Sequence, residues 1–511
     1  MAVRPYDSTV EDTVGEVLEL VKGVVGEDWV TDDPAITIGY SKDNSFETAK
    51  KPHIVALPEN TEQVQEIVRI AGRYGMAVQP ASAAINCAGG CIPQRGGILL
   101  DLRRMDKILE IDAENMTITM QPAVRFGVAQ NVLRQQGLYA VNPSAPHTAG
   151  VATNHMDKGI GMPANKFGVG PDHIVSMTFV MPDGEILKTG SSALPGAEKV
   201  CVEGPGPDIS GLFHSSMGIF GVMVEMITQV YEWPKVEVLK VAQFETEDLN
   251  EVSEFFYKVT REDFVNECSH LQDSYFSWFA TEDDEVGAGV VEYIPRNNAI
   301  VIMGGENEEE ARLKDEQFLR LVERNGYELM DDSVVDMLSD MIGDIAYECK
   351  VLQSTMRVTR FFGSFQVVWF NSNLDRVSDL HKKYQRLADK HFKDTDWRNW
   401  QVAYPPTEVT VYTQPLEFGR SVMLELDFFI SFDDSESVKR GLAFGYDAIN
   451  MVLDDGGHFD RPYGGSGSFN FGTLQTPRLG TYSELLGELK ADIDPRNIMA
   501  PGRLNLPVDP A

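Results

Sequence analysis

The stretch QPASAAINCAGGCIP, residues 79–93, follows a short apolar segment and consists mostly of small residues. Main-chain N–H groups in such a loop can hold a phosphate, because small side chains leave the backbone accessible. Ser82 and Asn86 add a hydroxyl and an amide that can also donate hydrogen bonds. The stretch therefore predicts either a phosphate-binding loop or a simple turn.

The cysteines argue against a metal centre. Cys87 and Cys91 are four residues apart, but no second Cys or His pair stands nearby to complete four ligands. The remaining three, Cys201, Cys268 and Cys349, are scattered, and an odd total of five does not suit a disulfide framework. We therefore expect no metal site and a reducing, cytoplasmic environment.

The composition indicates a globular protein with a large acidic excess. The 511 residues are 43% apolar and 24% charged, which suits two packed domains or more. The net charge of −34 makes nucleic acid an unsuitable partner. The charge fits solubility, attraction of a basic electron-transfer partner, or a salt-adapted host. No signal-like N-terminus and no apolar stretch of about 18 residues occurs, so we expect neither export nor a membrane span.

The pattern along the chain predicts three parts. Residues 1–234 read as an α+β unit with a helical lead-in, a strand–helix–strand segment and a hairpin at Pro182–Gly184. Residues 235–455 alternate long strands with acidic amphipathic helices, which suits an antiparallel sheet with helices on one face. Residues 456–511 are expected to pack back on the first part.

Four segments, taken in order, carry a family resemblance: VALPENTEQVQEIVRIA, CAGGCIPQRGGILLDLRRMDKI, FGVGPDHIVSMTFVMPDGEILKTG and DIDPRNIMAPGR. Together they resemble the flavoproteins of the vanillyl-alcohol oxidase and p-cresol methylhydroxylase family, which also contains FAD-linked 2-hydroxy-acid dehydrogenases. The resemblance implies an α+β fold: an FAD-binding domain of the p-cresol methylhydroxylase type over residues 1–234, a cap or substrate domain over 235–455, and a C-terminal segment returning to the first domain. The implied cofactor is FAD.

The family loop usually reads like P-R-G-G-G-T-S, whereas here ASAAIN follows Pro80 and the glycine run and arginine are absent. Alanine costs about 1 kcal/mol where φ must be positive. Ile85 or Asn86 stands where some relatives attach flavin through a histidine, which excludes that bond. The residues that the resemblance assigns to FAD are Ser82, Ala83, Ala84, Ile85, Asn86, Pro143, Ser144, Thr148, Gly150, Thr153, Asn154, Gly159, Gly161, Gly218, Ile219, Val222 and Arg503.

The segment GGHFDRPYGG resembles the place where the phenol-oxidising branch carries a Tyr-Arg pair beside flavin N5. Arg461 keeps the arginine, which can hold a phenolate or a carboxylate. Asp460 replaces the tyrosine and can act as a general base or pair with Arg461. With His458 and Tyr463, these are the predicted catalytic residues. Histidines that bind metal in some hydroxy-acid dehydrogenases are missing from the strand LELDFFISFDD, so no metal is expected.

Two further histidines stand beside the predicted flavin segment. His173 resembles a family Asp-His pair that supports the next strand, and His155 is expected to be the more exposed candidate for catalysis.

The resemblance implies an FAD-dependent oxidase or dehydrogenase that removes a hydride from an aromatic alcohol or alkylphenol. A 2-hydroxy acid is the alternative substrate, and a flavin-free binding or assembly subunit with a degenerate phosphate loop is the alternative function. Oxygen, a cytochrome and an electron-transfer flavoprotein all remain open as electron acceptor. A homo-oligomer is expected by analogy with the family.

Overall fold

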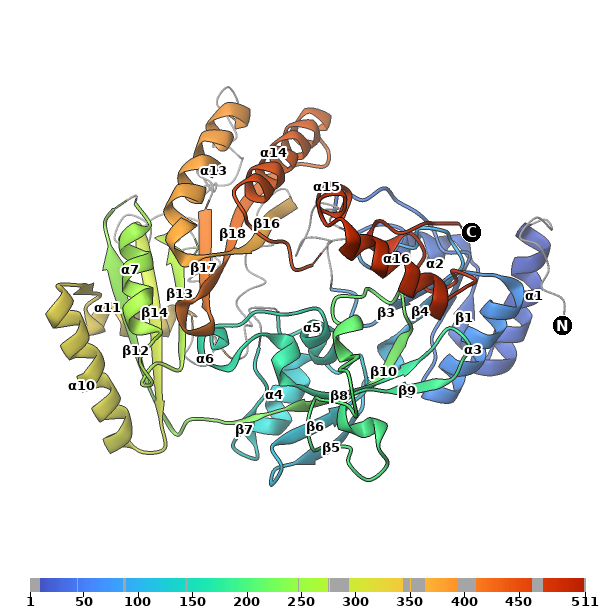
Figure 1. The fold of residues 1–511 in the computed structure, drawn as a ribbon, viewed down its shortest axis with the longest axis horizontal. Coiled ribbons are helices and arrows are strands. Elements are labelled where there is room, and N and C mark those ends of the chain that lie inside the picture. Colours follow the sequence, from blue (N-terminus) through green and yellow to red (C-terminus); the bar gives the residue numbers. More distant parts are fainter. Residues whose placement is uncertain are drawn as a thin grey trace.

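The structure is a computed structural model that describes residues 10–43, 45–85, 89–142, 146–246, 248–273, 275, 294–342, 350, 364–392, 410–461 and 472–509. These residues mix helices with sheets of four, five, two and seven strands, which confirms the predicted α+β class. Figure 1 shows the seven-stranded sheet and its helices on the left and the smaller sheets on the right. The short helices α5 (Val151–Met156) and α6 (Ala164–Phe167) are drawn between them.

A four-stranded sheet leads into the predicted phosphate loop. Its order is β1–β2–β4–β3, with β2, β4 and β3 parallel. Its strands are β1 (Val30–Thr31), β2 (Ile54–Ala56), β3 (Val78–Ala81) and β4 (Ile98–Asp101), with helices α1 (Val10–Val25), α2 (Pro34–Thr37) and α3 (Thr61–Tyr74) nearby in sequence. Helix α3 begins after Asn60, because the Asn60 side chain accepts the Gln63 N–H at 2.9 Å. The predicted strand–helix–strand segment is confirmed.

A five-stranded sheet in the order β5–β6–β10–β8–β9 continues this half of the molecule. Its strands are β5 (Ile108–Asp112), β6 (Thr117–Met120), β8 (Ile174–Val180), β9 (Ile186–Lys188) and β10 (Val222–Gln229), accompanied by helix α4 (Phe126–Arg134) and the pair β7 (Leu138–Tyr139) and β11 (Tyr231–Glu232). Strands β8 and β9 form the predicted hairpin, in which the Gly184 N–H donates to the Met181 carbonyl at 2.8 Å.

The third large sheet has seven antiparallel strands in the order β15–β12–β14–β13–β17–β18–β16. They are β12 (Val236–Phe244), β13 (Glu267–Gln272), β14 (Asn297–Gly305), β15 (Glu328–Leu329), β16 (Ser364–Ser372), β17 (Thr410–Leu416) and β18 (Ser421–Ile430). One face packs against α7 (Asn250–Val259), α10 (Glu308–Asn325), α13 (Val377–Phe392) and α14 (Ser435–Asp454) through a large apolar core. Helix α11 (Asp332–Ile342) contacts the opposite face through Val335 and Leu338.

The face of this sheet opposite α13 and α14 is polar at its β16–β18 end. Because side chains alternate along a strand, Trp369, Tyr412, Glu425 and Asp427 lie there. We call these four residues the inner face. On the adjoining strand β17, the Gln414 amide donates to the Met162 carbonyl at 3.2 Å, so this side of the sheet adjoins the segment between α5 and α6.

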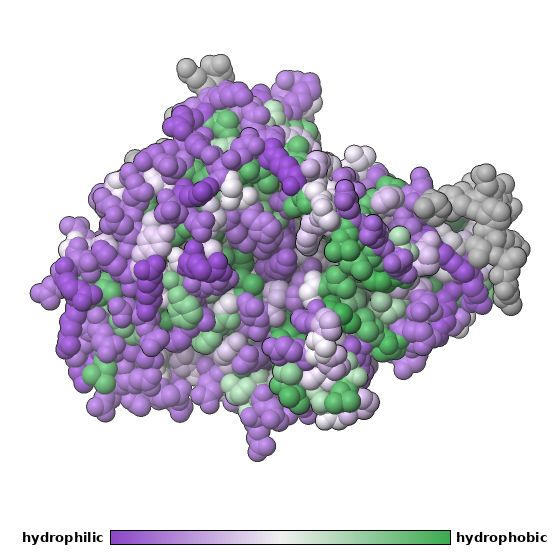
Figure 2. Space-filling view, viewed as in Figure 1, coloured by the Kyte–Doolittle hydropathy of each residue, from purple (hydrophilic) through white to green (hydrophobic). Residues whose placement is uncertain are grey.

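The last part of the chain returns to the four- and five-stranded sheets through α15 (Gly472–Gln475) and α16 (Thr481–Ile493). The buried Lys490 ammonium donates to the carbonyls of Ile219 and Met499, each at 2.8 Å. Met499 in turn bridges Val78 of β3. On its outer side α16 exposes Tyr482, and Figure 2 shows apolar surface in this part of the molecule. The C-terminal segment therefore packs against β3 and stabilises it.

Among the described residues, no helix combines the length and the apolar character needed to cross a membrane.

Candidate active site

The loop that follows β3 places an alanine in the left-handed region of the backbone. Ser82 is 9% exposed, and its Oγ accepts the N–H of Ala83. Ala84 has φ of +53°, which costs an alanine about 1 kcal/mol relative to glycine. Ile85 is partly exposed at 38%, and Asn86 lies outside the described residues. The loop thus keeps a glycine-like conformation at Ala84 without the glycine.

Arg503 holds this loop from behind. The side chain is 1% exposed, and its Nε donates to Gln79 Oε1 at 3.4 Å while Nη2 donates to the Ile92 carbonyl. Gln79 also donates to the Gly90 carbonyl at 3.2 Å. Because Gln79 precedes the loop and Ile92 follows it, Arg503 fixes both ends of the loop. Its side chain can therefore influence a bound cofactor by positioning the loop.

Three predicted cofactor residues, Gly218, Ile219 and Val222, lie behind β3. Gly218 has φ of +83°, and a Cβ there would come within 2.6 Å of Pro80 Cγ, so only glycine fits. Ile219 and Val222 are fully buried in the core. Their side chains are therefore packing groups, and only their main chain is available to a cofactor.

Helix α5 connects the loop with a second group of polar residues. At its start, Thr153 Oγ1 lies 3.2 Å from Ser82 Oγ. A Cβ on Gly150 would come within 2.8 Å of Thr153 Oγ1, so a side chain there would disrupt this approach. The helix has six residues and spans about 9 Å. Asp157 follows the last residue of this helix and lies near Arg461 of the C-terminal segment.

The turn after α5 uses the two other predicted glycines through their main chain. Gly159 donates its N–H to the Asn154 carbonyl at 2.9 Å, and the Gly161 carbonyl accepts from the Ala164 N–H at 2.9 Å. These bonds join α5 to α6 and fix the course of the predicted flavin segment.

Buried polar atoms without hydrogen-bond partners gather along this same segment. They are His147 Nδ1, Thr148 Oγ1, Asn154 Oδ1, both ring nitrogens of His155, Asp157 Oδ1 and Asn165 Oδ1. Buried polar atoms in proteins nearly always have a partner. Such a row therefore fits a polar ligand lying along residues 147–165, as a dinucleotide would. The predicted Pro143 and Ser144 lie outside the described residues.

The expectation that His155 is exposed is wrong. Its side chain is fully buried, with ring centroids 5.4 Å from His173 and 5.8 Å from Phe126. Burial lowers the pKa of His155 well below the ordinary value, so the ring is neutral. The turn of α5 directs this side chain into the core. His173 directly precedes β8, and its Nδ1 lies 2.8 Å from the Tyr231 hydroxyl of β11.

Arg461 is held in a fixed orientation at the far end of α5. Its guanidinium carbon lies 3.4 Å from the centre of the Trp369 ring, and its Nε lies 3.3 Å from Asp460 Oδ1. The Lys158 ammonium donates to the Asp460 carbonyl at 3.2 Å. Arg461 is 5% exposed. Asp460 is therefore paired with Arg461, as one of the two sequence interpretations has it.

The two other predicted catalytic residues are placed differently. His458 is exposed, and its main chain exchanges two hydrogen bonds of 2.8 Å with Asn371 of β16. Tyr463 lies outside the described residues.

Carboxyl groups near Arg461 are the part of the site that sequence reasoning missed. Burial raises the pKa of Glu425 to about 7, although the nearby Arg461 lowers it. Burial likewise raises the pKa of Asp157 to about 6, again against Arg461. Both groups therefore exchange protons near neutral pH. A signal was present in the LELDF stretch, where Glu425 and Asp427 alternate with apolar residues.

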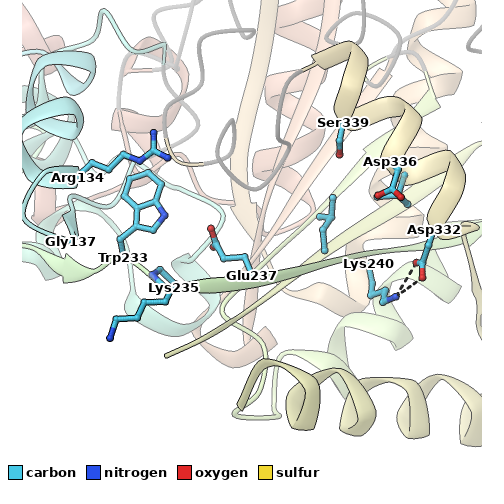
Figure 3. A pocket seen from close by; sticks show the side chains of 12 residues that line it. Arg134, Gly137, Trp233, Lys235, Glu237, Lys240, Asp332, Asp336 and Ser339 are labelled. Atoms are coloured by element: carbon cyan, nitrogen blue, oxygen red, sulfur yellow. Dashed lines mark hydrogen bonds and ion pairs between the residues drawn. The ribbon is translucent and has the colours of Figure 1, made fainter. Parts of the chain in front are cut away.

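A separate cavity of about 760 Å³ opens between α4, β12 and α11 (Figure 3). It is lined by side chains of both charges, including Arg134, Glu237 and an ion pair between Lys240 and Asp332 at 2.9 Å. None of the predicted site residues lines it, so it is distinct from the Arg461 site.

Comparison with known proteins decides the cofactor. Residues 52–190 match the family model described as an FAD binding domain. This stretch is an FAD-binding domain. It contains the loop after β3, helix α5 and the row of unpartnered polar atoms, so the residues present fit FAD.

Relatives in sequence match somewhat less than half of the chain. Glycolate oxidase subunit GlcD of Bacillus subtilis (strain 168) is 29% identical over 234 residues, which are 46% of this chain and 48% of that protein. D-lactate dehydrogenase of Anaerostipes hadrus is 30% identical over 227 residues, 44% of each chain. The chain thus spans somewhat less than half the length of these relatives.

Solved structures match the whole chain. The structure of p-cresol methylhydroxylase with substrate bound has a TM-score of 0.83, 18% identity and 99% coverage of both chains. That of 4-ethylphenol oxidase from Gulosibacter chungangensis, in complex with isoeugenol, has a TM-score of 0.81 at 19% identity, again covering 99% of both. The FAD-binding domain therefore belongs to a fold of the p-cresol methylhydroxylase type, as predicted.

Proposed function

We propose that this protein is an FAD-dependent oxidoreductase that takes a hydride from an aromatic alcohol or an alkylphenol. The observation that supports it is Arg461, whose guanidinium carbon lies 3.4 Å from the centre of the Trp369 ring and whose charge acts on the Glu425 carboxyl. A fixed cation stabilises an oxyanion, and a carboxyl with a pKa of about 7 can take up the proton released. Both groups stand at the end of the helix that starts at the phosphate loop.

FAD, when bound, supplies the two-electron acceptor for the hydride. Glu425, in its carboxylate form, accepts the proton of the substrate hydroxyl. Arg461 stabilises the resulting phenolate or alkoxide oxygen, which favours departure of hydride from the activated carbon. Asp460 and Trp369 keep the guanidinium in place, so Asp460 is a positioning residue in this scheme. The substrate leaves oxidised by two electrons.

For the cofactor, we propose that the main chain of residues 82–85 and of Gly150 holds the pyrophosphate. Thr148, Thr153 and Asn154 would contact the remainder of FAD, because two of these three carry buried unpartnered atoms. Arg503 positions the loop.

Colour and anaerobic reduction test the proposal. Purified protein should be yellow, and its flavin absorbance should bleach when phenolic alcohols or alkylphenols are added without oxygen. A panel that also contains 2-hydroxy acids separates the two substrate classes. Bleaching by none of these compounds would contradict the proposed activity.

A 2-hydroxy acid is the second candidate substrate. The matches to GlcD and D-lactate dehydrogenase favour it, and an arginine can bind a carboxylate through two hydrogen bonds. The carboxyls of Asp157, Asp460 and Glu425 around Arg461 oppose a further anion, so we rank it second.

A flavin-free subunit is the third candidate, and the left-handed Ala84 in the loop is the feature that favours it. A colourless protein that takes up no added FAD would establish that alternative.

The electron acceptor, the oligomeric state and the location of the protein need separate tests. Stopped-flow reoxidation with oxygen, a cytochrome or an electron-transfer flavoprotein would identify the acceptor, and sedimentation would test the expected homo-oligomer. We place the protein in the cytoplasm, because Cys91, Cys201 and Cys268 are free thiols.

A further inference from the structure

Beyond Glu425, the inner face carries polar atoms that the proposed chemistry does not use. Asp427 is 1% exposed, and neither of its carboxyl oxygens has a hydrogen-bond partner. Thr410 is equally buried, and its hydroxyl also has no partner. The two residues stand directly opposite each other on β18 and β17. A buried carboxyl without a partner costs stability, so this pair does not serve folding.

The pair lies in line with the Arg461 site. Glu425 precedes Asp427 by two residues on the same face of β18. Trp369 on β16 pairs with Glu425, and its ring contacts the Arg461 guanidinium. Residues two apart on a strand are separated by about 7 Å. The unpartnered oxygens of Asp427 and Thr410 are therefore about as far from Glu425 as the two substituents of a para-substituted benzene ring are from each other.

We propose that Asp427 and Thr410 bind a hydrogen-bond-donating group of the substrate, a hydroxyl or an amine, at the end of an aromatic ring opposite the oxygen held by Arg461. This inference rests on the proposed function, because it takes Arg461 as the anchor of the first oxygen. It narrows the substrate to phenols with a second polar group.

A neutral donor and a cationic donor favour different protonation states of the Asp427 carboxyl. Burial raises the pKa of this carboxyl well above its usual range, which favours the protonated form when no ligand is bound. A neutral hydroxyl or amide can bond the protonated acid. A cationic amine favours the carboxylate instead, so its binding releases a proton.

Three ligands without a hydride to donate allow binding to be measured in the holoprotein. They share a phenol and differ in the para group: 4-hydroxyacetophenone only accepts there, 4-hydroxybenzamide donates as a neutral group, and 4-hydroxybenzamidine donates as a cation. Calorimetric titration in two buffers of different ionisation enthalpy gives each affinity and the protons released. We expect the amide or the amidine to bind about tenfold more tightly than the ketone. The ketone can accept only the O–H of the protonated acid, whereas the amide and the amidine also donate to the carboxyl oxygens of Asp427.

Variants separate the subsite from general effects. Asp427→Leu should abolish the preference for donors, and Thr410→Val should reduce it. Asp433→Leu, which removes an exposed carboxylate just after β18, is the matched control and should keep it. Flavin content and circular dichroism report folding for each variant. Asp427→Leu should also unfold at a higher temperature than wild type, because it removes an unsatisfied buried group.

The results distinguish the two claims. Equal affinities for the three ligands in wild type, or a preference that persists in Asp427→Leu, would overturn the subsite and leave the proposed oxidoreductase intact. Failure of all three phenols to bind would reject the phenol site itself, and the subsite with it. A larger gain for the amidine with proton release identifies an amine; a larger gain for the amide identifies a neutral donor.

Discussion

The two faces of strand β18 have opposite characters. On one side Leu424 and Leu426 are fully buried against the helices α13 and α14. On the other side lie Glu425, which interacts with Arg461, and Asp427, and burial raises the pKa of both carboxyls. The strand's period of two keeps these sets apart with no residue shared between them. Apolar core residues and the residues of the proposed site thus occupy alternate positions of the same strand.

This separation lets the inner face hold groups that a core could not tolerate. The helical side gains free energy by burying apolar area, at about 25 cal/mol per Å². The inner face loses some free energy of folding through the unpartnered carboxyl of Asp427. Substitutions on one side should therefore affect unfolding, and those on the other should affect turnover.

The largest effect is expected for Arg461→Ala, which removes the cation from the inner side. We expect turnover in anaerobic bleaching to fall about 10³-fold, because the developing oxyanion loses its stabilising charge. Flavin content should be unchanged. Arg478→Ala, which removes an exposed arginine paired with Asp454, is the control and should behave like wild type. Equal turnover in the two variants would remove Arg461 from the mechanism.

Leu424→Ala tests the helical side. We expect a loss of about 3 kcal/mol in the free energy of unfolding, because a fully buried leucine leaves a cavity. The rate of flavin reduction at saturating substrate should stay within about twofold below the unfolding transition. Denaturant titration and rapid-mixing kinetics measure the two quantities. A large rate loss with unchanged stability would show that the faces are not separate.

Glu425→Gln addresses the proton acceptor. In wild type, kcat/KM should rise with pH through about 7, because only the carboxylate accepts a proton. The variant should lose this limb and about 10² in rate near pH 8. Its stability should depend less on pH, since a raised folded-state pKa stabilises wild type below about 4.5 and that contribution is lost as pH rises through about 7. An unchanged pH limb in the variant would assign it to another group, such as Asp157.

The smallest change is expected at the loop. Ala84→Gly should raise the free energy of unfolding by up to about 1 kcal/mol, because glycine adopts the positive φ without strain. Ala83→Gly, at a neighbouring position without positive φ, should instead lower it slightly. Thermal unfolding of the FAD-loaded protein checks both. The same sign in both variants would mean that strain at Ala84 is negligible.

Much of the fold could be predicted because its signals are local. The Asn60 cap, the turn at Gly184 and the alternation along residues 421–430 each depend on neighbours in sequence. The cofactor could be predicted from ordered segments, although the loop itself lacks the usual glycines.

The site could be predicted only in part, since its members meet through long-range packing. Arg461 was identified, but its Trp369 partner and the Glu425 carboxyl come from distant strands. His155 was predicted to be exposed because a histidine in a polar segment gives no sign of the direction of its side chain. Arg503 was assigned to FAD, whereas its side chain bonds the two ends of the loop.

The bond between Arg503 and Gln79 joins residues 424 positions apart. Closing so long a stretch of chain costs entropy, which contacts formed earlier must offset. We therefore expect the loop after β3 to acquire its final shape late in folding. Flavin uptake should accordingly follow assembly of the scaffold and consolidate it, and not seed it.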